Sequence, residues 1–214
     1  AALWRHPIKS HGREELQTVT LKAGQTMPWD RHWAVTHDQT KYDPENPAWG
    51  MCRNFMIGTG TPGLAGLWAE LDAATGTVTL TPADLGPLRF CPDDPADVAR
   101  FLTWFAPLCA DGPLPTGVAK VPGRGMTDTP FPSVSIMNTA SHAAVAGRLG
   151  RPLEMERWRG NIWLAGAAAW AEHDWRGGSL RIGGPVRARL HRIRGCVSHG
   201  PTPPRRTRGP RPMG

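Results

Sequence analysis

The chain has 214 residues, enough to bury a substantial core, and it carries 25 basic and 18 acidic residues. The formal net charge of +7 is concentrated at one end, because residues 191–214 hold six arginines and no acidic residue. The remaining residues are close to neutral, which excludes a protein that is basic over its whole surface. An anionic partner such as nucleic acid is therefore expected only for the last segment.

The four cysteines are widely spaced and form no C-x-x-C pair, which excludes the cysteine density of disulfide-linked secreted domains. No run of about 18 apolar residues occurs, and "AALWRHPIKS" at the start lacks the apolar core of a signal peptide. These features predict a soluble protein of the reducing cytoplasm without a membrane segment.

Short β-prone runs bounded by Gly, Pro or Asp predict a mainly β protein. The clearest hairpin lies in 67–82, where apolar and polar residues alternate on both sides of a Thr75-Gly76 turn, so that one face should join the core. The other runs are 16–21, 31–37, 134–137, 161–166 and 179–193.

Two segments instead predict short helices. Residues 95–108 follow an Asp-rich start and place apolar residues at i, i+3, i+4 and i+7. Residues 140–149 are rich in alanine, follow an Asn or Thr cap and end at Gly150. The Gly- and Pro-rich segment between them, 110–132, is predicted to be a linker or a long surface loop.

We place the division between two subdomains inside this loop. The predicted units are an N-terminal β subdomain over 1–118, a core domain over 119–196 and a Pro/Arg/Gly-rich tail over 197–214.

The ten tryptophans include four in "WRGNIWLAGAAAWAEHDW" at 158–175. Aromatic rings interleaved with arginine can stack nucleic-acid bases, but such a platform needs basic strands, and Glu172 and Asp174 lie among these rings. Packing between β layers is the favoured interpretation.

Common catalytic motifs are absent, since the sequence contains no G-x-x-x-x-G-K-[ST], no H-E-x-x-H and no G-x-S-x-G. Instead, basic and amide residues stand where extended runs begin or end. Cations, hydroxyls and amides of this kind are suited to binding a phosphate group, although each arginine alone is most often a solvated surface charge. The residues are Lys9, Ser10, Arg31, Arg159 and Asn161.

Five segments, in order, resemble the MOSC family, named after the C-terminal domain of molybdenum cofactor sulfurase. The similarity is greatest to the branch that includes the mitochondrial amidoxime-reducing component and its bacterial relatives. "HPIKS" resembles its Y-P-V-K-S opening with His6 in place of Tyr, and "RWRGNIWLAG" resembles F-R-P-N-I-x-V with Gly160 in place of Pro. The other segments are "DRHWAV" at 30–35, "ASHAAVAGRLG" at 140–150 and "EHDWRGGSLRIG" at 172–183.

The resemblance implies a MOSC-type β-barrel that carries molybdenum bound to molybdopterin. "RIRGC" stands where the family has its R-C-x-x-T, so Cys196 would be the catalytic cysteine and the metal ligand. A soft thiolate suits such a metal, and Arg192 or Arg194 would favour the ionised thiol. The other three cysteines, Cys52, Cys91 and Cys109, are expected to be small buried hydrophobes.

By position in the family, the five polar residues named above would hold the pterin and its phosphate. Weaker candidates are Arg53 in "MCRNF" and Thr139 or Ser141 at the start of a helix, since helix N-termini bind anions.

After Cys196 the family continues with a threonine, an acidic residue and further strands. This chain reads "VSHGPTPPRRTRGPRPMG" instead, a composition typical of a GC-rich gene read out of frame. We expect the tail to be out-of-frame or truncated sequence, to be disordered, and to leave the barrel incomplete.

The leading functional hypothesis is an enzyme, a molybdenum-dependent oxidoreductase that reduces small N-hydroxylated compounds. The chain has no C-x₄-C-x₂-C motif, so a separate ferredoxin- or flavin-type protein would supply the electrons. One alternative is a non-redox carrier of the cofactor or of sulfur on Cys196. Another, less favoured, is nucleic-acid binding through the basic tail.

Overall fold

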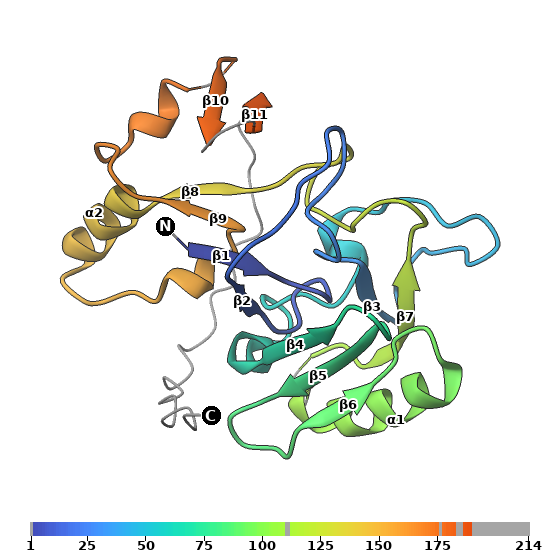
Figure 1. The fold of residues 1–214 in the computed structure, drawn as a ribbon. Helices are drawn as coiled ribbons and strands as arrows, with labels where there is room; N and C mark the ends of the chain where they lie inside the picture. Colours follow the sequence, from blue (N-terminus) through green and yellow to red (C-terminus); the bar gives the residue numbers. More distant parts are fainter. Residues whose placement is uncertain (1, 110–111, 176, 183–185, 190–214) are drawn as a thin grey trace, which may run out of the picture.

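The computed structural model describes residues 2–109, 112–175, 177–182 and 186–189. Strands make up most of the regular structure, with two α-helices and several short 3-10 turns (Figure 1). The elements are β1 (Ala2–Arg5), β2 (Glu14–Leu16), β3 (Trp33–His37), β4 (Trp68–Asp72), β5 (Thr77–Thr81), β6 (Leu88–Phe90), α1 (Pro95–Phe105), β7 (Pro115–Lys120), β8 (Ile136–Asn138), α2 (Thr139–Leu149), β9 (Ile162–Leu164), β10 (Ser179–Ile182) and β11 (Val186–Arg189).

The strands form four sheets. The largest has the order β2-β1-β9-β8, and the others are β4-β5-β6, β3-β7 and β10-β11. Among the strands that the structure describes, only β8 and β9 pair in parallel. The predicted mainly β class with short helices is confirmed, but the described residues form separate sheets and no closed barrel.

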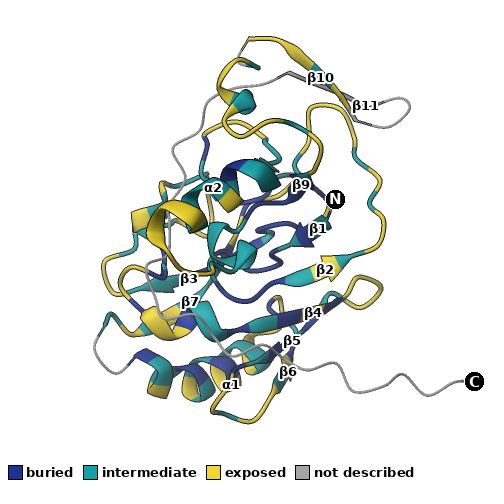
Figure 2. Ribbon diagram, turned by 90° about the vertical axis from the view of Figure 1, so that its left-hand side faces the viewer, coloured by how far each residue is buried: buried dark blue, intermediate teal, exposed yellow. Residues whose placement is uncertain are grey.

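The first strand joins chain segments that are far apart in the sequence. β1 pairs with β2 on one side and with β9 on the other, where Leu3 lies opposite Ile162. In both views this sheet lies between α2 and the β4-β5-β6 sheet (Figure 2). The segments that follow β1 and precede β9 are therefore brought together in the interior of the fold.

The predicted hairpin and the first helix are confirmed and share the main core. Val78 and Leu80 of β5 point into this core, as the alternation predicts, and Gly76 takes the left-handed backbone that the turn requires, with φ of 69°. Phe101 of α1 stacks on Phe90 with ring centroids 4.6 Å apart. Asp94 caps α1 by accepting a hydrogen bond from the Asp97 main-chain N–H at 2.8 Å.

The second helix connects two parallel strands. The side chain of Asn138 caps α2, and Gly150 ends it with φ of 65°, as the sequence predicts. Such a connection must cross back over the sheet, usually through a helix, because parallel neighbours cannot be joined by a tight turn. This unit presents the loop at 159–161 to β1.

Two predicted features are wrong. Residues 110–132 are not a structureless linker, since β7 lies within them and pairs antiparallel with β3. The run at 16–21 contributes only its first residue to β2, because nothing pairs with Gln17–Leu21 in the described structure. Tertiary pairing, rather than local composition, decides both cases.

The predicted division at 118/119 falls inside β7. Among the described residues, no helix combines the length and apolar character needed to span a bilayer.

Candidate functional site

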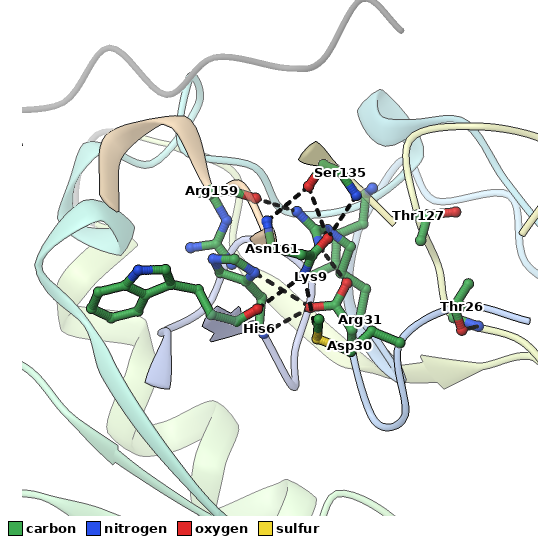
Figure 3. A network of polar contacts seen from close by, with 12 residues as sticks. His6, Lys9, Thr26, Asp30, Arg31, Thr127, Ser135, Arg159 and Asn161 are labelled. Atoms are coloured by element: carbon green, nitrogen blue, oxygen red, sulfur yellow. Dashed lines mark hydrogen bonds and ion pairs between the residues drawn. The ribbon is translucent and has the colours of Figure 1, made fainter. Parts of the chain in front are cut away.

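Three segments meet in the interior, and main-chain hydrogen bonds fix their arrangement. Arg31 N–H donates to the His6 carbonyl at 2.6 Å, and Lys9 N–H donates to the Trp33 carbonyl at 2.7 Å. Trp4 N–H donates to the Asn161 carbonyl at 2.8 Å. Residues separated by up to 150 positions therefore line one site, which we call the polar cluster (Figure 3). It consists of Lys9, Asp30, Arg31, Asp128 and Arg159.

Asp30 is the buried anion at the centre of the polar cluster. Its Oδ1 accepts a hydrogen bond from His6 N–H at 2.8 Å and lies 3.3 Å from His6 Nδ1, while Oδ2 accepts from Arg31 Nη1. Burial alone would raise the pKa of Asp30, but Arg31 and the contacts from His6 outweigh burial and hold the pKa well below its usual value. Asp30 is thus ionised and orients both neighbours.

Arg31 connects the N-terminal region to the loop before β9. Its Nη2 donates to the Arg159 carbonyl at 2.8 Å, and its Nη1 lies 3.5 Å from Asn161 Oδ1. Burial opposes its charge, but Asp30 and Asp128 raise its pKa overall. The charge of Arg31 is therefore already balanced by protein carboxylates.

Lys9 is balanced in the same way. Its Nζ donates to Asp128 Oδ1 at 2.5 Å and to the Met126 carbonyl at 2.9 Å. Burial would raise the pKa of Asp128, yet Lys9 and Arg31 lower it to about 2. Cys52 also donates to Asp128 Oδ1, with Sγ 3.0 Å away, so this partly exposed thiol belongs to the site and is not the buried hydrophobe predicted from the sequence.

Arg159 differs from the other two cations. Its Nη2 donates to the Gly12 carbonyl at 3.1 Å, and among the described residues no carboxylate forms an ion pair with it. Burial and the nearby charges of Arg31 and Arg13 lower its pKa to about 9. A guanidinium in this position would be stabilised by an added anion, which would restore the missing opposite charge.

The side chain of Asn161 connects neighbouring chain segments through hydrogen bonds. Its Oδ1 accepts from Ser135 N–H at 3.1 Å and from the Ser135 hydroxyl at 2.8 Å, and its Nδ2 donates to the Trp4 carbonyl at 3.1 Å. These bonds join three chain segments around the polar cluster.

Three of the predicted site residues have left-handed backbones, which is uncommon outside glycine. They are Ser10, Arg31 and Arg159, with φ of 64°, 50° and 52°. Such conformations store strain and often mark sites where side-chain direction matters.

Among the described contacts, none joins the weaker candidates to the polar cluster. Arg53 is exposed in a 3-10 turn beside Cys52. The Thr139 hydroxyl donates to the Leu164 carbonyl, and the Ser141 hydroxyl accepts from Trp170 N–H. Both hydroxyls thus hold α2 against neighbouring chain segments.

Cys196, Arg192, Arg194 and the tail at 197–214 lie outside the described residues. Within the described part of the chain, no group of three or more His, Cys, Asp and Glu side chains could hold a metal ion. The predicted ligation by Cys196 remains a prediction.

Sequence reasoning missed two members of the polar cluster, Asp30 and Asp128, and did not single out its neighbours His6 and Arg13. The signal for Asp30 was its position next to Arg31, since a buried arginine needs an opposite charge. It also missed "GTGTPG" at 58–63, which matches the G-x-G-x-x-G pattern. This segment leads into a short 3-10 turn at Pro62–Gly66 and not into an α-helix, so it lacks the structure of a dinucleotide site.

Comparison with known proteins gives one match. The family model described as the MOSC N-terminal beta barrel domain matches residues 1–97. A search of curated proteins and a search of solved structures each find no match. The resemblance to the MOSC family is thus confirmed by residues 1–97, while the resembling segments beyond residue 97 and the closer resemblance to the amidoxime-reducing branch stay predictions.

Proposed function

Because residues 1–97 are a MOSC N-terminal domain, we propose that this protein binds a molybdenum–molybdopterin cofactor at the polar cluster and reduces N-hydroxylated compounds with it. MOSC domains are associated with molybdenum-cofactor-related proteins, some of which are enzymes. Substrate class, electron donor and activity are the parts of the proposal that go beyond the family.

The observation that carries the proposal is the unbalanced charge of Arg159. Lys9 and Arg31 have carboxylate partners, so their charges are balanced without an added anion. Arg159 has only a carbonyl partner among the described residues. The phosphate of molybdopterin is a dianion, and a guanidinium can bind two of its oxygens at once. The donor set therefore fits the anionic end of the cofactor.

The residues present suggest a division of work. Arg159 would hold the phosphate, and the ion pairs around Asp30 and Asp128 would keep the site in shape. Cys196 is the proposed metal ligand, because thiolate is a suitable donor for molybdenum. The metal would supply two-electron oxygen-atom removal, so that an N–OH group, two electrons and two protons give an N–H group and water. The sequence has no iron–sulfur motif of its own, so a ferredoxin- or flavin-type partner is proposed as the electron source.

The first test is the molybdenum content of the purified protein, measured by elemental analysis. Arg159→Met should lower the molybdenum-to-protein ratio by at least about tenfold, as expected for loss of a charge-assisted bidentate contact. The matched control is Arg148→Met, which removes an exposed arginine near the end of α2 and should leave the ratio unchanged. Equal ratios in both variants would contradict the proposed cofactor site.

The second test separates the enzyme from a carrier. The molybdenum-loaded protein is mixed with an amidoxime and a chemically reduced mediator, and amidine formation is measured. Turnover supports the reductase. Bound molybdenum without turnover would instead support the non-redox carrier. A purified protein that contains no molybdenum would refute the proposal.

A further inference from the structure

Two buried N–H groups near the polar cluster have no hydrogen-bond partner among the described residues. They are Nε of Arg13 and Nε1 of Trp4. Both residues are only 6% exposed, so neither group is freely hydrated. Buried donors in proteins are almost always paired, and an unpaired one calls for a specific explanation.

The two side chains lie on the same face of the β1–β2 pair. Trp4 lies opposite Glu15 and Arg5 opposite Glu14. Continued by one residue beyond the strands, this register would set His6 opposite Arg13, with Trp4 on that same face, two residues along. The ion pair between Arg5 and Glu14, at 2.7 Å, belongs to the other face. The unpaired donors thus share one surface of the strand pair.

Both donors also border one aromatic ring. The Arg13 guanidinium carbon lies 4.5 Å above the centre of the Trp68 ring, and the Trp4 ring centre is 6.1 Å from that of Trp68. An arginine stacked on an indole keeps its N–H edges free to bind in the plane of the guanidinium.

Toward the part of the chain that the structure describes, Arg13 donates from only one of its nitrogens. Its Nη1 donates to the Ala65 carbonyl at 2.8 Å and lies 3.5 Å from the Leu67 carbonyl. The edge that contains Nε is the edge with which arginine grips a carboxylate. Glu154 and Glu156 are close enough to favour its charge, but neither forms an ion pair with it among the described residues.

We propose that Arg13 and Trp4 form a binding site for a small planar oxyanion, above all a carboxylate, distinct from the ion pairs of Lys9 and Arg31. The Arg13 edge would bind two carboxylate oxygens or one, the Trp4 indole N–H would add a further bond, and the flat Trp68 ring would select a planar group. Arg159 adds positive charge nearby, since it lowers the pKa of its neighbours His6 and His11. The site does not depend on the proposed reductase activity.

The experiment is a titration of ¹⁵N-labelled full-length protein with benzoate, followed through the indole N–H resonances. The Trp4 resonance should shift and saturate. Trp4→Phe keeps the ring and removes the donor, so its benzoate affinity should fall about fivefold, the usual effect of one hydrogen bond. Arg13→Gln should abolish saturable binding altogether.

Trp49→Phe is the matched control. Its Nε1 already donates to the Thr127 carbonyl at 2.8 Å, and an arginine, Arg124, also lies over its ring. This variant should bind benzoate like the unaltered protein. A Trp4 resonance that does not shift, or equal affinity in Trp4→Phe and Trp49→Phe, would overturn the proposal.

A parallel titration with inorganic phosphate distinguishes this site from the proposed cofactor site. Benzoate should bind in the presence of phosphate, and Trp4→Phe should retain its full molybdenum content. If phosphate shifts the Trp4 resonance and benzoate does not, the Arg13 and Trp4 donors bind a tetrahedral anion. That result would overturn the proposed site for a planar carboxylate. Loss of molybdenum in Arg159→Met alone would leave this inference intact, so the two proposals fail independently.

Discussion

Arg31 reaches across 128 residues of sequence to donate a hydrogen bond from Nη2 to the Arg159 carbonyl, at 2.8 Å. Both residues have left-handed backbones. The side chain of one thus fixes the main chain of the other, which sets the direction in which the Arg159 guanidinium extends. An ion pair with Asp30 holds Arg31 in turn, so the position of the unbalanced cation depends on a carboxylate that does not touch it.

The first prediction concerns that carboxylate. Asp30→Asn removes the negative charge beside buried Arg31, and we expect a loss of about 3–5 kcal/mol in the free energy of unfolding, because an unpaired buried charge is left. Urea denaturation measures the loss. Asp38→Asn, at a position 67% exposed, should change the same quantity by no more than about 0.5 kcal/mol. A small effect at Asp30 would mean that water reaches Arg31.

The second prediction is a loss of stability in mild acid. Burial lowers the pKa of His6 and of His11 to about 3, so both are neutral in the folded protein. The unfolded chain binds protons at both histidines below about pH 6.5, so it gains protons that the native state does not. Stability is therefore highest above that pH and falls as the pH drops from 6.5 towards 3.

Each histidine contributes up to about 1.4 kcal/mol per pH unit in this range. Urea denaturation at pH 7, 6 and 5 should show the fall, and His11→Gln should make it about half as steep. Asp30 and Asp128 add to the loss only below about pH 4, since their lowered pKa values matter only when the unfolded carboxylates protonate. Stability that stays constant between pH 7 and pH 5 would show that neither histidine is buried in solution.

The third prediction uses two glycines. A Cβ at Gly160 would lie 2.2 Å from Met137 Cγ, so Gly160→Ala should cost about 1–3 kcal/mol through overpacking beside the site. A Cβ at Gly147, inside α2, would meet nothing within 4 Å. Gly147→Ala should therefore stabilise the protein by up to about 1 kcal/mol through helix propensity. Thermal unfolding of both variants tests the pair, and a neutral Gly160→Ala would contradict the packing at β8.

The fourth prediction separates Cys196 from the other cysteines. Cys196→Ser should lower bound molybdenum, because a neutral hydroxyl is a poorer donor than a thiolate. Cys109→Ser is the control, since Cys109 is buried and burial raises its pKa to about 11. Cys52→Ser should also retain molybdenum, because a hydroxyl can still donate to Asp128. Elemental analysis measures the molybdenum-to-protein ratio of the three variants. The same ratio in Cys196→Ser as in the other two would refute Cys196 as the metal ligand.

The features predicted well from the sequence are those fixed by local patterns. The helix at α1 follows from its apolar spacing and Asp94 cap, and the β4–β5 hairpin follows from alternation about Gly76. β7 was missed because its residues include proline and glycine, and only its pairing with β3 makes it a strand. Pairing between distant segments leaves no periodic signal in either segment alone.

The same distinction applies to the site. Residue type and family resemblance predicted Lys9, Arg31 and Arg159, and the structure places these residues together in the polar cluster. Which of them is balanced by a carboxylate could not be predicted, because Asp128 reaches Lys9 from 119 residues away. No sequence pattern singled out Arg13. Only the folded chain shows that its Nε has no hydrogen-bond partner among the described residues.

The pairing of Leu3 with Ile162 also governs when the protein can fold during synthesis. A ribosome adding about 5–20 residues per second needs roughly 8–30 s to make the intervening chain. Throughout that time β1 has an open edge, and buried charges such as Asp30 and Arg31 lack the neighbours that surround them later. The nascent N-terminal region therefore exposes an unpaired strand edge during this time, which a chaperone could cover, and slower translation would lengthen the exposure.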